Sequence, residues 1–258
     1  MPDIVARITE NVAQISGRIA DAAVRSGRAA NDITLVAVTK FVSVAEVRAL
    51  VAAGCHELGE SRPQQLWERA AELADLPIHW HLIGHLQRNK VRRTVPLTPM
   101  IHSVDSPRLL AAIDAELTRT GGGTVPIFGL GREASAQKWD CPPSLNVLLE
   151  VNTSGETAKH GLQPEEVEPL LAELPQYPNL VVRGLMCMAS LEGGLDAARR
   201  DFAALRQLRD RLLNRCPSGV ALDELSMGMS GDFEVAIEEG ATIVRVGSAL
   251  FEGVESNP

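Results

Sequence analysis

The feature that most constrains this chain is a regular alternation of short apolar runs with longer segments of helical periodicity. Eight runs have the length and composition of buried strands: 33–39, 54–59, 78–84, 100–104, 145–151, 180–187, 222–226 and 242–246. Seven helical segments separate them: 43–53, 61–75, 86–95, 106–119, 164–174, 194–214 and 231–239. Eight strands alternating with helices within 258 residues predict a single (β/α)8 TIM barrel, an α/β fold.

The segment before the first strand predicts an extra helix. Its isoleucines and one valine recur every three or four residues from Ile4 to Ile19, and the pattern ends near Gly27. A doubly wound open sheet is the alternative fold, but no G-x-G-x-x-G follows the first strand. We expect one domain, 1–258, in which the turn-rich stretch 121–143 is a surface excursion at the N-terminal face of the barrel.

Composition excludes several classes of protein. The chain has 25 Lys+Arg against 33 Asp+Glu, and a net charge of −8 argues against generic binding to nucleic acid. No apolar run approaches the roughly 18 residues that a membrane span needs, and charged residues interrupt the N-terminus, so we expect neither membrane insertion nor a signal peptide. The four cysteines form no C-x-x-C pair, which favours a reducing compartment. The expected location is the cytoplasm.

Lysine is scarce in this sequence, and one lysine follows a predicted strand directly. The chain has four lysines, and Lys40 directly follows the first strand. At the C-terminal end of a barrel strand we expect it to be partly desolvated, with a lowered pKa and an amine that can attack an aldehyde. A lysine that extends into solvent from a strand end is the alternative. Lys90 and Lys159 lie in polar contexts, and Lys138 lies in the excursion.

The ends of the last two strands predict an anion site. Ser226 and Met227 begin a Gly/Ser-rich loop after the seventh strand, and Ser230 is expected to cap the helix 231–239, whose first N–H groups then face a phosphate. Gly247 and Ser248 follow the eighth strand. Loops at these two positions frequently bind phosphate in such barrels; two ordinary helix-capping turns are the alternative.

Two groups of polar residues lie in apolar surroundings. Arg245 interrupts the eighth strand, and its guanidinium needs a partner such as a carboxylate or the ring nitrogen of a bound heteroaromatic ligand. His79, His81 and His85 alternate on and after the third strand. Without a nearby carboxylate or cysteine we assign them positioning or core roles and predict no metal site.

Together these segments resemble the pyridoxal phosphate homeostasis proteins. The resemblance covers nearly the whole chain outside the excursion and is carried by 37–40, 81–90, 101–105, 151–156, 225–231 and 244–250. It implies a stand-alone barrel like the N-terminal domain of alanine racemase, with pyridoxal 5′-phosphate (PLP) held as an internal aldimine. Lys40 is then the Schiff-base lysine, and Arg245 faces the pyridine nitrogen. Ser230, Gly247 and Ser248 hold the phosphate, with Ser226 and Met227 close by.

The chain departs from the family pattern after the second strand. Where the family usually reads Gly-Glu-Asn-Tyr, this sequence has Ser61 and Arg62 in the last two positions. The change puts one cofactor contact in doubt and alters the charge of the rim.

The resemblance leaves two functions open. The first is PLP binding and homeostasis without a catalytic residue, in which PLP-dependent apo-enzymes are possible recipients and the chain is a monomer or a weak homodimer. The second is a racemase-like isomerase, which needs a second acid/base on the other face of the cofactor. In alanine racemases that group is a tyrosine placed by a further domain. We expect no such domain here, and Tyr177, the one tyrosine, is expected at the N-terminal face. These points favour the binding protein.

Overall fold

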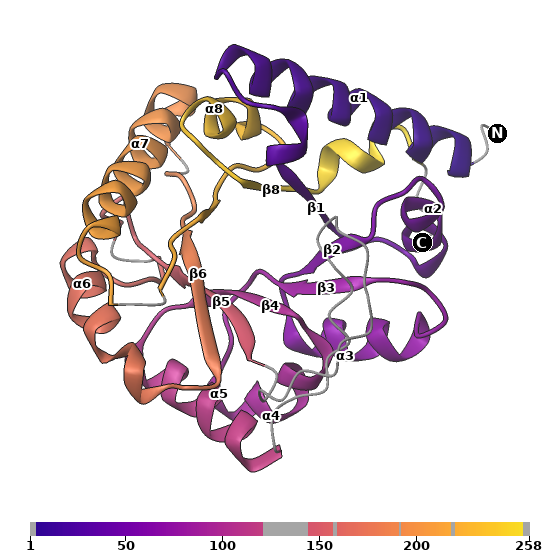
Figure 1. The fold of residues 1–258 in the computed structure, drawn as a ribbon. Coiled ribbons are helices and arrows are strands. Elements are labelled where there is room, and N and C mark those ends of the chain that lie inside the picture. Colours follow the sequence, from indigo (N-terminus) through magenta and orange to yellow (C-terminus); the bar gives the residue numbers. More distant parts are fainter. Residues whose placement is uncertain (1–3, 121–143, 157–158, 191, 218–219, 255–258) are drawn as a thin grey trace.

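A computed structural model describes residues 4–120, 144–156, 159–190, 192–217 and 220–254. Eight parallel strands close into a barrel in chain order (Figure 1). The strands are β1 (Thr34–Val38), β2 (Glu57–Glu60), β3 (His79–Leu82), β4 (Met100–Val104), β5 (Leu145–Glu150), β6 (Leu180–Met186), β7 (Glu224–Ser226) and β8 (Ile243–Val246). Pairing of β1 with β8, which places Thr34 opposite Ile243, completes the ring. The barrel prediction is confirmed and the open sheet is excluded.

Helices form the outer layer around the strands (Figure 1). They are α1 (Ile4–Arg25), α2 (Val44–Ala52), α3 (Pro63–Glu72), α4 (Val91–Thr94), α5 (Pro107–Thr120), α6 (Pro164–Glu173), α7 (Gly194–Leu213) and α8 (Phe233–Glu238). Five short 3-10 helices complete the described elements: η1 (Ala30–Asp32), η2 (Arg88–Lys90), η3 (Val95–Leu97), η4 (Leu174–Gln176) and η5 (Ser248–Phe251). No helix in the described ranges is long and apolar enough to cross a membrane.

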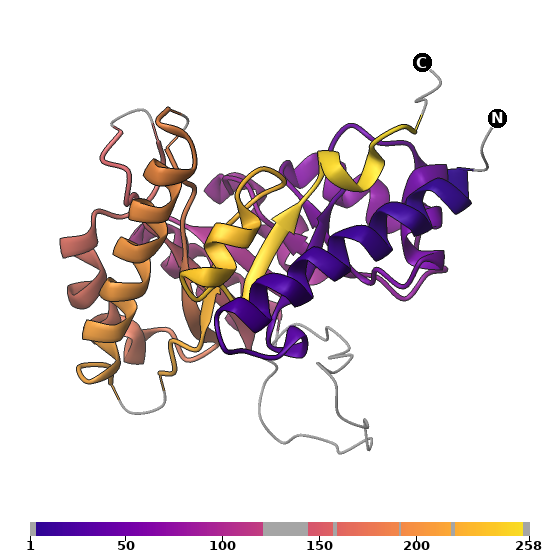
Figure 2. The same cartoon turned by 90° about the horizontal axis from the view of Figure 1, so that it is seen from above.

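The extra helix α1 is confirmed, and its apolar face explains its place. Ile8, Ile15 and Ile19 are buried, and the helix packs against α2, α8 and η5, as Figure 2 shows from above. The buried Asn11 amide donates to the carbonyl oxygens of Leu250 and Glu252 at 3.1 and 2.9 Å. These contacts anchor the chain segment that follows β8 and thereby hold η5 in place.

Two predicted helices differ from the observed ones. The segment 86–95 is no single helix but a succession of η2, one α-helical turn (α4) and the start of η3. Pro96, which has no N–H to donate, accounts for the end of α4. The predicted helix 231–239 is shortened to α8, which begins after Asp232. The excursion 121–143 lies outside the described residues.

The barrel interior has an apolar half and a polar half. Val36, Met100, Leu148, Met186 and Ile243 come from different strands and form a cluster separate from the core between strands and helices. Neighbouring strand residues alternate between the two sides of the sheet, so Arg245 faces the interior with Ile243, whereas Val244 faces the helices. The polar half carries the residues considered next.

Candidate functional site

Lys40 lies at the C-terminal end of β1, in the turn that follows Thr39. Thr39 is fixed to the neighbouring strand, because its N–H donates to the Gly59 carbonyl at 3.0 Å and its hydroxyl to Glu60 at 2.6 Å. Lys40 itself is exposed, so the expectation that it is partly desolvated is wrong for the isolated chain. The reason is the turn: Phe41 has a φ of 65° and is 73% exposed, which carries the chain out of the barrel immediately.

The other described lysines have different surroundings. The Lys159 ammonium donates to Glu156 at 3.0 Å and to the Ala189 carbonyl at 2.8 Å. Lys90 is half-buried in η2. Lys138 lies outside the described residues. Of the three described lysines, Lys40 alone directly follows a barrel strand.

The departure from the family pattern also lies beside Lys40. The Arg62 guanidinium lies 5.7 Å from the centre of the Phe41 ring, within the range of a cation–π contact. Arg62 therefore adds a positive charge to the rim of the mouth next to the lysine.

Ser230 and Gly247 come together, as the predicted anion site requires. The Ser230 Oγ accepts hydrogen bonds from the N–H groups of Gly247 at 3.1 Å and Ala249 at 3.5 Å. Ser230 does not cap α8, so that prediction is wrong: the helix begins at Phe233, and the Asp232 carboxylate accepts from the Met229 N–H at 2.6 Å. The segment after β8 thus directs two main-chain N–H groups at one oxygen atom of the loop after β7.

The remaining predicted residues of these loops have distinct environments. Ser248 is exposed at the start of η5. The Met227 side chain is buried in the core, and its N–H donates to the Ile243 carbonyl at 3.1 Å. Gly247 is needed for close approach, since a Cβ atom there would lie 3.3 Å from the Cβ of Val38 on β1. The cradle defined by Ser230, Gly247 and Ser248 therefore lies against the strand that leads to Lys40.

Arg245 is buried, and its guanidinium has two partners inside the barrel. It donates to the Ser226 hydroxyl at 2.6 Å and to the Cys187 carbonyl at 2.9 Å. Burial lowers the pKa of Arg245, while the nearby carboxylates of Glu150 and Asp232 oppose that shift. A guanidinium has five N–H donors, so these two bonds leave donors for an acceptor at the mouth.

A chain of hydrogen bonds crosses the interior from Ser226. His102 Nδ1 lies 2.9 Å from the Ser226 Oγ, and His102 Nε2 lies 2.8 Å from His81 Nδ1. His81 Nε2 lies 2.7 Å from Glu57, whose other oxygen lies 2.7 Å from His79 Nδ1. The prediction that these histidines have no nearby carboxylate is wrong, because β2 brings Glu57 beside β3. Glu57 and His102 are the residues that sequence reasoning missed here.

The donor and acceptor are fixed at both ends of this series of hydrogen bonds. Arginine can only donate and an ionised carboxylate can only accept. Burial alone would raise the pKa of Glu57, but the hydrogen bonds with His81 and His79 outweigh it, and the net shift is downward. Burial, with the nearby charges of His81 and Arg245, lowers the pKa of His102 well below its ordinary value. Ser226 therefore accepts from Arg245 at one end of the series, and Glu57 accepts from His81 at the other.

Glu150 is a second acid that sequence reasoning missed. It ends β5, is buried, and shares its interior-facing side with Leu148. Burial and then the charge of Asp105 raise the pKa of Glu150 to about 7, against the opposing effect of Arg245. The sequence feature that could have identified Glu150 is its position as an acidic residue at the end of an apolar strand.

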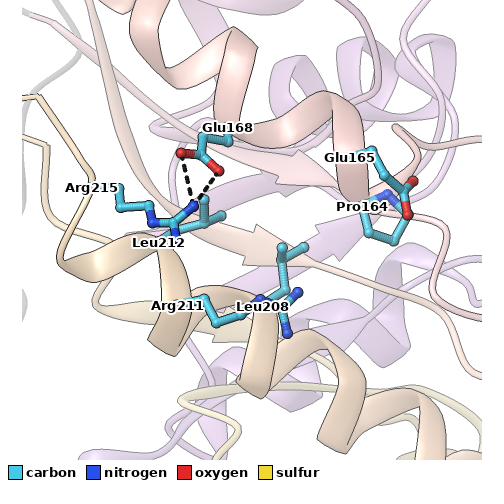
Figure 3. Close-up of a pocket in the computed structure, with 7 residues that line it drawn as sticks. All are labelled: Pro164, Glu165, Glu168, Leu208, Arg211, Leu212 and Arg215. Atoms are coloured by element: carbon cyan, nitrogen blue, oxygen red, sulfur yellow. Dashed lines mark hydrogen bonds and ion pairs between the residues drawn. The ribbon is translucent and has the colours of Figure 1, made fainter.

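Two further features are remote from the mouth. Tyr177 precedes β6, so it lies at the N-terminal end of the barrel as predicted. A groove of about 170 Å³ lies between α6 and α7 in the outer layer (Figure 3). The Arg215 guanidinium spans it and pairs with Glu168 at 3.1 Å. Neither feature contributes to the site at the strand ends.

Comparison with known proteins defines the class first. Residues 7–254 match the family model of the alanine racemase N-terminal domain. The fold is also that of an alanine racemase from Corynebacterium glutamicum, with a TM-score of 0.62 at 15% identity; the match covers 98% of this chain and 63% of that one. The protein is thus a barrel of the alanine racemase N-terminal type.

Closer relatives then define the family. The pyridoxal phosphate homeostasis protein of Pseudomonas aeruginosa is 40% identical over 95% of this chain and 94% of its own length. That of Aquifex aeolicus is 36% identical over 94% and 96%. PipY of Synechococcus elongatus, in its structure with PLP bound, is 33% identical with a TM-score of 0.76, over 95% of this chain and 99% of that one. The chain belongs to the family of pyridoxal phosphate homeostasis proteins.

Proposed function

We propose that this chain binds PLP through Lys40 and the cradle of Ser230, Gly247 and Ser248, and that it takes part in the control of PLP in the cytoplasm. Family membership supports the ligand, because a relative of the same fold has a structure with PLP bound. The observation that carries the proposal is the position of Lys40 relative to the cradle. Lys40 follows β1, and Gly247 of the cradle contacts Val38 on that same strand.

The residues fit the chemical groups of PLP one by one. The main-chain N–H groups of Gly247 and Ala249 already converge on the Ser230 oxygen, an arrangement that also suits a phosphate oxygen. Ser248 adds an exposed hydroxyl at the start of η5. Arg245 offers a cationic donor to the ring nitrogen, and the exposed Lys40 amine is free to form a Schiff base with the aldehyde. Ser226 supports the site by accepting from Arg245, and Met227 by the hydrogen bond of its N–H to the Ile243 carbonyl.

These residues favour a binding protein over a racemase. PLP acts as an electron sink when its ring nitrogen is protonated, and a permanently cationic donor such as Arg245 leaves that nitrogen unprotonated. The hydrogen bonds from Arg245 through Ser226 to His102 hold the guanidinium in place for this contact. Tyr177 lies at the opposite end of the barrel and cannot act as the second acid/base. The proposed activity is reversible storage of PLP and its transfer to PLP-dependent apo-enzymes, by a monomer or a weak homodimer.

Lys40 provides the deciding experiment. Protein loaded with PLP is reduced with borohydride, and the modified peptide is located by mass spectrometry alongside the visible absorption spectrum. We expect one modified residue, Lys40, and complete loss of covalent labelling in Lys40→Ala. Lys159→Ala is the matched control, because that lysine lies in the loop after β5 at the same end of the barrel, and it should label normally. Covalent labelling of Lys40→Ala equal to wild type would overturn the assignment.

A further inference from the structure

A cluster of three side chains outside the proposed cofactor site has the composition of a metal site. His85, Asp105 and His160 follow β3, β4 and β5, so three successive loops at the C-terminal face bring them together. One ligand atom from each lies within 4.8 Å of the others. We propose that these three residues bind a divalent late transition-metal ion such as Zn²⁺, a site that is separate from the proposed PLP function.

The contacts within the cluster already orient the ligands. His85 Nδ1 lies 3.0 Å from Asp105 Oδ2, and the His85 and His160 rings are stacked with centroids 4.3 Å apart and planes 15° from parallel. Ser106 donates to the second Asp105 oxygen at 3.0 Å, which fixes the plane of the carboxylate. Two imidazoles and one carboxylate form a common ligand set for zinc that leaves a position open for water or another ligand.

The backbone near each ligand is well anchored. The Gly84 carbonyl beside His85 accepts from the Ser103 hydroxyl at 2.6 Å. Asp105 comes directly after β4. On the third loop, the N–H of Leu162, two residues after His160, donates to the Glu150 carbonyl at 2.8 Å. Only side-chain rotation is therefore needed to bring the ligand atoms to the separation of about 3 to 3.5 Å that zinc–ligand bonds of about 2 Å imply.

The cluster is open to solvent and lies beside positively charged side chains. His85 and His160 are exposed and Asp105 is half-buried, so an ion can enter from solvent without opening the fold. His85 and Asp105 also line a pocket of about 480 Å³ together with Arg88 and Arg108. Those arginines favour a small anion as the additional ligand, because they supply positive charge beside the open position.

The test is a titration of the full-length, tag-free protein with Zn²⁺ against a chromophoric chelator, after treatment with EDTA and its removal. We expect one ion per chain. His85→Gln, Asp105→Asn and His160→Gln should each weaken binding about tenfold or more, because a three-residue site loses a ligand. His56→Gln is the matched control: His56 is exposed but precedes β2 at the other end of the barrel, and its loss should leave the affinity unchanged.

A second measurement uses the unaltered protein and so does not depend on how variants fold. Zn²⁺ should protect His85 and His160, but not His56, from diethyl pyrocarbonate, as located by mass spectrometry. Co²⁺ should give a spectrum without a thiolate charge-transfer band. Three results would each overturn the proposal: equal zinc affinity in wild type and in a variant that combines all three substitutions, no protection of His85 and His160, or a thiolate band.

Discussion

The two sides of the barrel mouth are built from different chemical groups. The cradle side, beside β7, β8 and β1, consists of Ser230, Gly247, Ser248 and the buried Arg245. The histidine side, beside β3, β4 and β5, consists of His85, Asp105 and His160. The cradle side directs main-chain N–H groups whose positions follow from closure of the barrel, whereas the histidine side depends on three side chains that are exposed or half-buried.

This difference teaches how one barrel can carry two unlike sites. Main-chain donors have no protonation equilibrium near neutral pH and lose little entropy when they bind an anion, so the donors of the cradle do not change with pH. Protons compete with a metal ion for histidine and aspartate ligand atoms, so metal binding on the histidine side should depend on pH. Glu150 lies between the two sides, because both Asp105 and Arg245 affect its pKa.

The largest expected effect is a loss of stability on mutation of the buried hydrogen bonds behind the cradle side, compared with mutation of the exposed contacts on the histidine side. His102→Leu removes the partner of His81 Nδ1 and one of the two side-chain partners of Ser226, which keeps its contact with Arg245. The loss of both buried hydrogen bonds should cost about 4 kcal/mol of unfolding free energy. His85→Leu removes the surface contacts with Asp105 and with the His160 ring and should cost about 0.5 kcal/mol. Urea unfolding measures both. Equal losses would abolish the distinction between the two sides.

The second effect is a pH dependence that arises from Glu150. Its pKa rises from 4.5 to about 7 on folding, so the folded protein binds this proton more tightly than the unfolded chain does. The stabilisation is fully present below pH 4.5 and is lost as the pH rises to about 7. The change amounts to about 3 kcal/mol across that window.

Unfolding curves of wild type and Glu150→Gln across this pH range isolate the effect, because the variant lacks the titrating group. Asp105→Asn should shift the window to lower pH, since the Asp105 charge contributes to raising the pKa. The measurements are made in EDTA so that bound metal does not alter the result. Parallel pH profiles for wild type and Glu150→Gln would contradict the role of Glu150.

The smallest effect concerns the close approach at the cradle. Gly247→Ala places a Cβ atom 3.3 Å from the Cβ of Val38, and the φ of −120° is accessible to alanine, so we expect a loss of about 1 kcal/mol. PLP affinity should fall as the loop after β8 moves away from β1. Gly231→Ala is the control in the same region, because a Cβ atom there has nothing within 4 Å. If both variants bind PLP alike, the cradle does not depend on this contact.

Much of the fold could be predicted because its signals are local. Buried parallel strands are continuous apolar runs, and α1 shows a helical period, so the eight strands and the extra helix follow from neighbouring residues. The prediction was wrong for 86–95, where the spacing of apolar residues reads as one helix but only Val91–Thr94 is α-helical. It was also wrong for Ser230, whose hydroxyl bonds to the next strand's loop and not to its own helix.

The residues of the site also fall into those with a local sequence signal and those without one. Lys40, Ser230, Gly247 and Arg245 could be placed at the mouth because each follows or ends a strand, and parallel strands in a barrel end at the same face. Glu57, His102 and Glu150 could not be assigned, because their roles depend on partners from other strands. The exposure of Lys40 was also missed, since it results from the turn at Phe41.

The sequence by itself determined that eight strands alternate with helices and that a scarce lysine and two Gly/Ser loops stand at strand ends. Periodicity and position along the chain contain that information. Only the tertiary structure decided that Arg245, Ser226, His102, His81 and Glu57 form one hydrogen-bonded chain and that three loops bring His85, Asp105 and His160 together. The physical reason is that hydrogen bonds and metal ligation act over a few ångströms in space, and the closed barrel brings distant residues within that range.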